Sequence, residues 1–443
     1  MDLPEPLGRP LVASRRWGAW VVMAFAICWG YLAYDRDFDP DWLALGWDPG
    51  GNVGANLRTY RYTARLAREG QSFYEVAPPG LEEWAVYLYP PITVVAYYPF
   101  TLLEWMHGYW LLVCLNVLAG LVVAGAIVQF VDGTAGQLAW LDVALITGVV
   151  LLSPFTFGTI YYGNINLLVA LAFVVGFLAL EHDRPVVSGA AFGLAALFKL
   201  FPALVGAWLL RRRAWRAVAS AIAVGGGGLF AGLVVYGWGP TATFFTEVLV
   251  DRAETAAFVG GYPAGGTFYV TVQRPLSHLL WGAFPGAPPE LLTPLSVLVC
   301  GGALAVFYTD VETFHERLVA ILATVFVTVT VFPALQWYLV LSFFPMVPLW
   351  YVWDGPGRLL FLAGGAVMFG NAYPAGLVEW VREFGLPPLP ELVLANVFTF
   401  ATMQLYGIAI MLVACALAKF GVHPRREVAR LAARFSTDRR EGR

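Results

Sequence analysis

The stretch "SGAAFGLAALFKLFPALVGAWLLRRR", residues 188–213, is apolar throughout except for one lysine near its middle and three arginines at its end. A single helix over 186–210 would hold Lys199 in mid-bilayer, where a charge costs about 2.5–3.5 kcal/mol. Two short spans broken at "KLFP" would instead bring Lys199 to a water-filled outer surface. The break would also explain Pro202, because a cavity can satisfy the backbone groups that such a break frees. The stretch therefore indicates a membrane protein and favours the broken form over the single span.

The composition of the chain points to the same class of protein. Of its 443 residues, 59% are hydrophobic and 13% are charged, and the mean hydropathy is +0.67. Soluble domains carry about 25% charged residues, whereas a membrane span needs about 20 mostly apolar residues. Many such stretches occur, and they leave no room for a large soluble domain. We expect an all-α polytopic membrane protein in which residues 1–443 form one integral membrane domain with about twelve transmembrane helices.

The placement of basic residues predicts how the chain is oriented in the membrane. Arg15 and Arg16 precede the first apolar run, "RRRAWR" follows at 211–216, and the tail 420–443 is strongly basic. Because cytoplasmic loops are enriched in Lys and Arg, we expect a multi-pass protein of the cell membrane with both termini in the cytoplasm. The number of spans is then even. The first apolar run lacks a small-residue cleavage site, so no cleavable signal peptide is expected.

Two long polar segments are expected on the outer side. In the first, 35–86, Leu57, Tyr60 and Leu66 roughly follow a helical period between arginines, which predicts an amphipathic helix at the membrane interface. The second, 237–288, is rich in glycine, proline and aromatic residues.

The segment 87–105 begins with "YLYPP" and either spans the membrane or re-enters it from the outside. A full span is open, because a helix tolerates proline in its first turn. The topology with a break at Lys199 makes it a segment that dips and does not cross, and we favour that form. Its tyrosines, Tyr87, Tyr89, Tyr97 and Tyr98, are then expected to anchor it at the lipid headgroups.

Polar residues beside the apolar runs are candidates for a site. Lys199 is the only lysine or arginine within an apolar run, and a cation there suits a phosphate group; the alternative is a lysine that reaches the headgroups. In "SPFTFGTIYYGNIN" (153–166), Tyr162, Asn164 and Asn166 precede an apolar run and are candidates for substrate binding. Asparagine also serves well as a helix N-cap, and the two roles can coexist.

Further candidates lie in two more stretches. "FPALQWYLV" (332–340) contains Gln336, Trp337 and Tyr338, which could stack on a sugar or belong to the aromatic belt at the headgroups. In the second outer loop, Thr267 and Arg274 are candidates for substrate binding. Arg274 could pair with phosphate or lie at the interface.

Sugar transfer to a hydroxyl requires a carboxylate as general base. The first outer loop supplies several, and the candidates for this catalytic role are Asp39, Asp41 and Asp48. Most acids in such a run are ordinary solvated surface.

Several classes of chemistry lack support in the sequence. There is no P-loop, no dinucleotide-binding glycine pattern, no nucleophile elbow and no zinc-ligand spacing. The cysteines lie apart from one another in apolar runs, which predicts packing roles. We expect no cofactor and no metal site, with a divalent metal left open, and no nucleic-acid partner.

The order of the motifs resembles a known family. An acidic outer loop is followed by "LAREGQSFYEVAPP" (66–79), "YLYPP" (87–91), "SPFTFGTIYYGNIN", the lysine-containing stretch and "QWYLVLSFFP" (336–345). This series, over roughly 15–350, resembles the family-87-like branch of the C-type glycosyltransferases, which includes polyprenyl-phosphate-mannose-dependent alpha-mannosyltransferases.

The resemblance implies a fold like that of the C-type glycosyltransferases and a sugar donor linked to polyprenyl or dolichyl phosphate. It also implies transfer of a hexose such as mannose, with inversion, to a lipid-linked or cell-surface glycan on the extracytoplasmic side. Tyr89 is placed with the substrate-binding residues on this basis.

In the family, an aspartate of the first outer loop is the base, and here Asn56 stands where that acid is expected. Asparagine cannot accept a proton. Either another carboxylate has taken the role, Asp48 being nearest, or the register differs, or the activity is altered. The family's Gly-Gln-x-Asn reads Gly163-Asn164-Ile165-Asn166, which keeps an amide.

Two other functions remain as alternatives to the enzyme. One is a transporter or flippase of a lipid-linked sugar, and the other is a non-catalytic subunit of a glycan-assembly complex. The long acidic outer loop with its helix favours the enzyme, because a transporter has little need of it.

Overall fold

The computed structural model describes residues 16–37, 52–81, 85–135, 138–250, 256–263, 269–353, 357–370, 385 and 396–421. Of residues 32–37, 135 and 256 it describes only the backbone. Asp39, Asp41, Asp48 and Thr267 lie outside the described residues.

Helices dominate the described chain. In the first half they are α1 (Trp17–Asp37), α2 (Ala55–Arg68), the 3-10 helix η3 (Pro91–Tyr97), α3 (Tyr98–Thr101), α4 (Trp105–Ala135), α5 (Trp140–Leu152), α6 (Pro154–Tyr161), α7 (Asn166–Glu181), α8 (Pro185–Phe198), the 3-10 helix η4 (Phe201–Val205) and α9 (Gly206–Arg211). In the second half they are α10 (Trp215–Tyr236), α11 (Trp238–Thr243), the π-helix η5 (Phe244–Val248), the 3-10 helix η6 (Ala256–Phe258), α13 (Gln273–Ala283), the 3-10 helix η7 (Pro289–Leu291), α14 (Leu292–Tyr308), α15 (Phe314–Thr330), the 3-10 helix η8 (Gln336–Ser342), α16 (Phe343–Val352), α17 (Arg358–Phe369) and α20 (Met403–Lys419).

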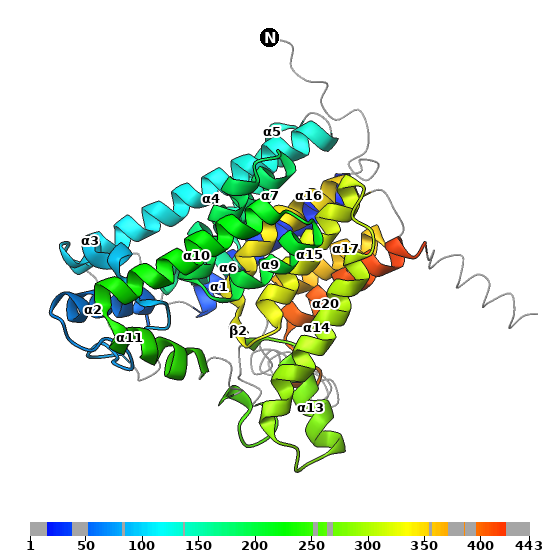
Figure 1. The fold of residues 1–443 in the computed structure, drawn as a ribbon. Helices are drawn as coiled ribbons and strands as arrows, with labels where there is room; N and C mark the ends of the chain where they lie inside the picture. The colour runs from blue at the N-terminus through cyan, green and yellow to red at the C-terminus, as the bar shows by residue number, and fades with distance from the viewer. Residues whose placement is uncertain are drawn as a thin grey trace, which may run out of the picture.

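The helices form a bundle in which α8 packs between α7 and α10, and α4 packs against α5 and α7 (Figure 1). At one end of the bundle, α2 packs against η3 and α3. Two short strands, β1 (Tyr269–Val270) and β2 (Ala334–Leu335), pair antiparallel, with Tyr269 opposite Leu335. The strand pair joins the segment that leads into α13 to the segment that leads into η8.

The centre of the bundle is the continuous unit formed by α15, η8 and α16. Every side chain from Leu318 to Thr330 is buried, and so is every one from Gln336 to Tyr351. By contrast, only Ala217 and Gly232 are buried in α10. An apolar helix with so little buried surface has the character of a helix that faces lipid.

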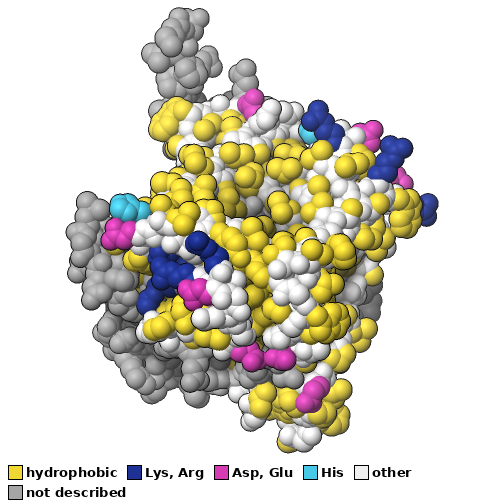
Figure 2. All heavy atoms as spheres, turned by 60° about the vertical axis from the view of Figure 1, so that its left-hand side comes forward, with side chains coloured by type: hydrophobic (Ala, Val, Ile, Leu, Met, Phe, Trp, Pro, Cys, Tyr) yellow, Lys and Arg dark blue, Asp and Glu magenta, His cyan; other side chains and the backbone are white. Residues whose placement is uncertain are grey.

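The described helices agree with a multi-pass membrane protein. Three of them are long and apolar enough to cross a bilayer, at 105–134, 215–236 and 289–308, and α5 with α6 would add a fourth span bent by 41°. Figure 2 shows hydrophobic side chains over most of the face turned to the viewer, with charged side chains in small groups. Shorter apolar helices account for further stretches, and the count of about twelve spans stays a prediction.

Each of the two segments that divide the candidate topologies contains a 3-10 helix, η3 in one and η4 in the other. Residues 91–101 form η3 and α3, of seven and four residues, which are too short to cross a bilayer. The helix break expected at "KLFP" is present, because α8 ends at Phe198, Lys199 is extended (φ −148, ψ 117) and η4 follows. Which side of the membrane these segments face stays a prediction.

A buried carboxylate ties three helices together at one end of the bundle. Asp142 of α5 is fully buried and accepts hydrogen bonds from Trp20 Nε1 (2.7 Å), Arg16 Nη1 (3.0 Å) and the Tyr351 hydroxyl (3.0 Å). The Asp142 carboxylate also accepts a hydrogen bond from the Ala139 amide at 2.9 Å, and this bond caps the first turn of α5. These donors satisfy the charge, so the residue is a structural clasp between α1, α5 and α16.

A second ionic cluster joins α7, α9 and α15. Glu181 pairs with Arg212 (2.7 Å) and Arg317 (3.0 Å). The neighbouring Arg211 donates to the carbonyls of Tyr308 and Thr309. Asp310, the residue after Thr309, pairs with Lys419 of α20. The hydrogen bond from Lys419 holds the pKa of the Asp310 carboxyl below its usual value.

The cysteines are free thiols in the structure. Cys28 and Cys114 are exposed, whereas Cys300 and Cys415 are buried.

Candidate active site

Lys199 lies at the centre of the site, at the break between α8 and η4. Its side chain is fully buried, and its ammonium donates to the hydroxyls of Tyr89 and of Tyr338, the latter at 3.2 Å. The nitrogen also lies 4.6 Å from the Tyr89 ring centroid and 4.9 Å from that of Tyr338. Three residues that the sequence singled out, far apart along the chain, therefore form one contact group.

A second layer of tyrosines surrounds Tyr89. The Tyr60 hydroxyl of α2 lies 3.3 Å from that of Tyr89, and the Tyr60 ring stacks on Tyr97 at 4.4 Å. Tyr74 donates to the Tyr89 carbonyl at 2.7 Å, and Tyr87 is fully buried beside them. We call these five residues, Tyr60, Tyr74, Tyr87, Tyr89 and Tyr97, the tyrosine cluster.

The tyrosine cluster corrects one expectation from the sequence. Tyr87, Tyr89 and Tyr97 are 0–5% exposed, so they do not anchor the segment at the headgroups. Tyr98 is half-buried, with its hydroxyl 2.7 Å from that of Tyr236. The expectation was wrong because tyrosine hydroxyls suit a buried polar network as well as a membrane interface.

The partners of Lys199 in the described chain are neutral. No aspartate or glutamate among the described residues forms an ion pair with it. Burying an ammonium is costly unless an anion compensates it, and two hydroxyls compensate only in part. The arrangement is therefore suited to receive an anionic group.

The turn at 161–164 holds the start of α2 against the bundle. The amide of Gly54 donates to the Tyr161 carbonyl (2.7 Å), and that of Asn56 donates to the Tyr162 carbonyl (2.9 Å). Gly163 has φ +63, and a Cβ there would lie 3.1 Å from the Gly54 Cα. Glycine is thus required for both the backbone conformation and the close approach. Asn56, in the first turn of α2, is placed four residues before Tyr60 of the tyrosine cluster.

The two asparagines of "YYGNIN" are buried in this turn. Asn164 Oδ1 accepts from the Ile165 amide at 2.9 Å, and the Asn164 carbonyl accepts from Asn116 Nδ2 at 2.9 Å. Asn166 Nδ2 donates to Thr159 Oγ1 at 3.3 Å, while its Oδ1 has no partner among the described residues. The cap of α7 is Ile165 and makes no side-chain hydrogen bond, so neither asparagine is the N-cap.

The start of η8 lies next to this turn. The Trp337 ring lies 5.7 Å from that of Tyr162, and a Cβ on Gly158 would overlap the Trp337 ring. Gln336 is buried and accepts a hydrogen bond from Gln404 at 2.6 Å. Trp337 thus connects the "YYGNIN" turn to Tyr338 and, through it, to Lys199.

Arg274 belongs to a different part of the structure. It is buried in α13, where it donates to the carbonyls of Thr399 (2.8 Å) and Phe398 (3.2 Å). The structure does not bring it into contact with Lys199.

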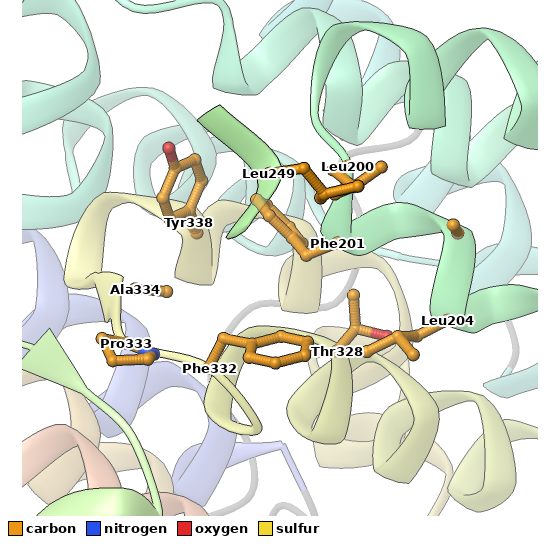
Figure 3. A pocket seen from close by; sticks show the side chains of 10 residues that line it. Leu200, Phe201, Leu204, Leu249, Thr328, Phe332, Pro333, Ala334 and Tyr338 are labelled. Carbon is orange, nitrogen blue, oxygen red and sulfur yellow. The ribbon is translucent and has the colours of Figure 1, made fainter. Parts of the chain in front are cut away.

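Two apolar cavities flank η4, the helix that follows Lys199 in the chain. The larger, of about 390 Å³, runs between α8, η4 and α10 and reaches Pro90. The smaller, of about 270 Å³, lies between η4 and the end of α15 and reaches Tyr338 (Figure 3). Leu200, Ala203 and Leu249 line both. Because Leu200, the residue after Lys199, lines both cavities, the apolar part of an amphipathic anion could lie in one of them while its charged group approaches Lys199.

Sequence reasoning did not single out the remaining members of this network. Tyr60 was assigned to the apolar face of a helix, and Tyr74 and Asn116 carried no separate signal. The clustering of tyrosines in 60–98 was the available clue.

No described group of three or more His, Cys, Asp or Glu residues could hold a metal ion. The polar groups at Lys199 are hydroxyls and an ammonium, which are poor ligands for a divalent cation.

These features define a multi-pass membrane protein with a buried cationic site at the end of its helices. The chain belongs to glycosyltransferase family 87, whose family model matches residues 87–335, more than half of its length. The match includes Tyr89 and Lys199 and ends one residue before Gln336.

The chain is also similar to individual proteins. It is 26% identical over 318 residues, covering 69% of this chain and 70% of the relative, to a polyprenol-phosphate-mannose-dependent alpha-(1-2)-phosphatidylinositol pentamannoside mannosyltransferase of Mycolicibacterium smegmatis. Solved structures of ArnT from Cupriavidus metallidurans align at low scores. The form bound to undecaprenyl phosphate has a TM-score of 0.31 and 18% identity, over 92% of this chain and 79% of ArnT. The apo form has a TM-score of 0.29 and 15% identity, over 90% and 76%. Scores this low carry no argument about the fold or the site.

Proposed function

We propose that this glycosyltransferase transfers a hexose, mannose in the first instance, from a polyprenyl- or dolichyl-phosphate donor to a lipid-linked or cell-surface glycan on the extracytoplasmic side. The observation that carries the proposal is Lys199, a fully buried ammonium that donates to two tyrosine hydroxyls and is followed by Leu200, which lines both apolar cavities. The mannosyltransferase relative named above, which depends on polyprenol-phosphate-mannose, supports the choice of donor.

In the proposed reaction, the bond between the anomeric carbon and the phosphate oxygen breaks as the acceptor oxygen forms a new bond to that carbon from the opposite face. The polyprenyl phosphate leaves with an additional negative charge. Lys199 stabilises this charge more in the transition state than in the ground state, which accelerates the reaction. Tyr89 and Tyr338 hold the ammonium in place for that purpose.

The proton of the acceptor hydroxyl passes to a carboxylate of the first outer segment. We assign this role to Asp48, with Asp41 and Asp39 as the other candidates. Asn56 and Tyr162 lie where α2 meets the 161–164 turn, and with Asn164, Asn166 and Trp337 they are proposed to contact the sugars. Thr267, Gln336 and Arg274 are kept as further proposed substrate contacts, and no metal is required by this scheme.

The first experiment measures transfer by the purified chain in liposomes. Polyprenyl-phosphate mannose is supplied as donor, and released polyprenyl phosphate is quantified. Lys199→Met should lower kcat/KM by about 10²–10³-fold, the usual loss when one group that stabilises developing charge is removed. Lys419→Met is the matched control, because Lys199 and Lys419 are the two lysines of the chain and Lys419 pairs with Asp310. Undiminished donor use by Lys199→Met would reject the phosphate contact.

A second experiment addresses the base. Asp48→Asn should abolish transfer while leaving the protein folded, as judged by gel filtration and thermal unfolding. Full activity of this variant would remove Asp48 from the role and direct attention to Asp41→Asn and Asp39→Asn.

A further inference from the structure

The two faces of α13 are reversed relative to an ordinary surface helix. Gln273, Arg274 and Ser277 are only 0–1% exposed, whereas Leu279 is 60% exposed and Ala283, one turn later, is exposed as well. Because successive residues of an α-helix are about 100° apart, Leu279 and Ala283 point away from Arg274 and Ser277. A surface helix usually turns its apolar stripe to the core, so the apolar face of α13 calls for a partner outside the bundle.

The polar face of α13 is fixed by hydrogen bonds to the rest of the protein. Arg274 donates to the Thr399 carbonyl at 2.8 Å. The side-chain amide of Gln273 lies 3.4 Å from both Thr293 Oγ1 and the Val331 carbonyl. These bonds set the rotation of the helix about its axis, and its apolar face is therefore turned outward by the fold.

The apolar face belongs to a larger patch around the turn between α13 and α14. We call this patch the apolar tip; its exposed members are Val259, Tyr262, Leu279, Ala283, Phe284 and Leu291. The Tyr262 ring stacks on that of His278 at 4.8 Å. Phe258, Trp281 and Leu292 form a small core of their own, separate from that of the bundle. The three segments that carry the tip are thus one packed unit.

The sequence around the tip is almost free of charge. Between Tyr269 and Tyr308 the residues charged at neutral pH are Arg274, which is buried, and Glu290. Phe284 at the end of α13 is 67% exposed. Large exposed apolar patches mark contact with a membrane or with another protein.

The position of α13 relative to α14 favours the membrane. Residues 289–308 are a candidate membrane span, and their 20 residues make it about 30 Å long, the thickness of the hydrocarbon layer. Gln273 contacts Thr293, and Trp281 packs on Leu292. Hence α13 lies beside the first turns of this span, at the level of one leaflet (Figure 1).

The apolar surface of the tip continues along α14. Leu291 and Leu298 lie two helical turns apart, so they share one face of the span, and both are exposed. Leu298, at 71% exposure, belongs to the part of α14 that faces lipid. The same surface therefore extends from lipid-facing side chains to the tip.

We propose that the apolar tip is inserted into the hydrocarbon of the leaflet at which α14 begins. The segment 237–288, expected from the sequence to lie outside the membrane, then returns to the bilayer at α13. An ordinary interfacial helix turns its polar face to water, whereas α13 turns its polar face to the protein. Lipid is favoured over a second protein because the tip lacks the polar rim of a protein interface. The inference is independent of the proposed sugar transfer.

Fluorescence quenching in nanodiscs that hold one copy of the full chain tests this placement. The two exposed native cysteines are first replaced by alanine. The environment-sensitive dye NBD is then attached to Leu279→Cys or Phe284→Cys. Leu298→Cys on the span is the control for lipid contact, and Gln71→Cys, exposed in the polar segment after α2, is the control for water.

The two quenchers are nitroxide lipids and aqueous iodide. A nitroxide at carbon 5 of the acyl chain should quench the labels at 279 and 284 by at least about half. Iodide should quench them at least about fivefold less than the label at 71. A nitroxide at carbon 12 should act most on the label at 298, which lies about 14 Å along the span from residue 289. The tip should therefore report a shallower depth than Leu298.

Three results would overturn the inference. Iodide quenching at 279 and 284 as strong as at 71 would show that the tip faces water. Labels that neither quencher reaches would show that protein covers it. Disulfide-linked dimers of Leu279→Cys in liposomes would assign it to a second copy. Each variant must match wild type in gel filtration, and Ala283→Cys, on the same face, replaces one that does not. None of these measurements involves sugar transfer.

Discussion

Two groups of basic side chains at opposite ends of α7 differ in how their charge is balanced. Toward its first residue, Asn166, Lys199 is fully buried, and its ammonium contacts only the neutral hydroxyls and rings of two tyrosines in the described chain. At its last residue, Glu181, the carboxylate pairs with Arg212 and Arg317, with side chains 18–25% exposed. The ends are about 24 Å apart, given 16 residues at 1.5 Å each.

The two groups show that the presence or absence of a built-in counter-ion distinguishes a structural charge from a functional one. The more exposed cluster has its anion built in and needs no ligand. The more deeply buried lysine, which needs an anion more, has none among its described neighbours. A buried cation without an anionic partner destabilises the protein, and such cations are found where a substrate supplies the negative charge.

The largest effect on transfer is expected from Lys199→Glu, which reverses the charge at the site. Lys199→Glu places a carboxylate among the tyrosines, where it would repel the donor's phosphate. We expect kcat/KM to fall by at least about 10³-fold in the liposome assay. Lys419→Glu is the control and should keep transfer within about twofold. Comparable losses in the two variants would show that charge at position 199 has no special role.

A smaller effect is expected from removing one partner of the ammonium. Tyr338→Phe keeps the ring over Lys199 but loses the hydroxyl, so kcat/KM should fall about tenfold, the value of roughly one hydrogen bond to a charged group. Tyr406→Phe, which loses a hydroxyl bonded to the Val397 carbonyl, is the control. If Tyr338→Phe is as active as wild type, Lys199 is held by other groups.

The opposite end of α7 should respond in stability rather than in activity. Glu181→Gln leaves Arg212 and Arg317 without a charged partner and should cost about 1–2 kcal/mol of unfolding free energy, as for a half-buried pair. Transfer should stay within about twofold because the site is distant. Denaturant unfolding in detergent and the liposome assay measure the two quantities, and a larger loss of transfer than of stability would contradict the distinction.

The smallest expected effect is on the stability of Lys199→Met. Replacing a buried, incompletely balanced ammonium by an apolar side chain of similar length should leave the unfolding free energy unchanged or raise it by up to about 1 kcal/mol. Thermal unfolding in detergent tests this. A marked destabilisation would mean that Lys199 is a structural residue like Arg212.

The sequence could predict features for which the alternative structure would be energetically costly. A lysine and a proline within one apolar run predicted the break between α8 and η4, since neither residue suits a continuous span.

The contacts within the site could not be predicted in the same way. Lys199 meets partners 110 and 139 residues away in sequence, and no periodicity reports such pairing. Tyr87 and Tyr97 were misplaced because apolar patterning in a membrane protein does not separate a buried face from a lipid-facing one. The partners of Arg274 could not be predicted either, because its contacts with the carbonyls of residues 398 and 399 depend on how α13 packs.

The clasp at Asp142 also bears on how the chain is made. Two of its donors, Arg16 and Trp20, precede it along the chain, whereas Tyr351 follows 209 residues later. At a synthesis rate of about 5–20 residues per second, roughly 10–40 s pass before that last donor exists. During this interval the nascent α1 and α5 must shield the carboxylate as a pair. The third donor, Tyr351, joins this contact only once α16 has been made.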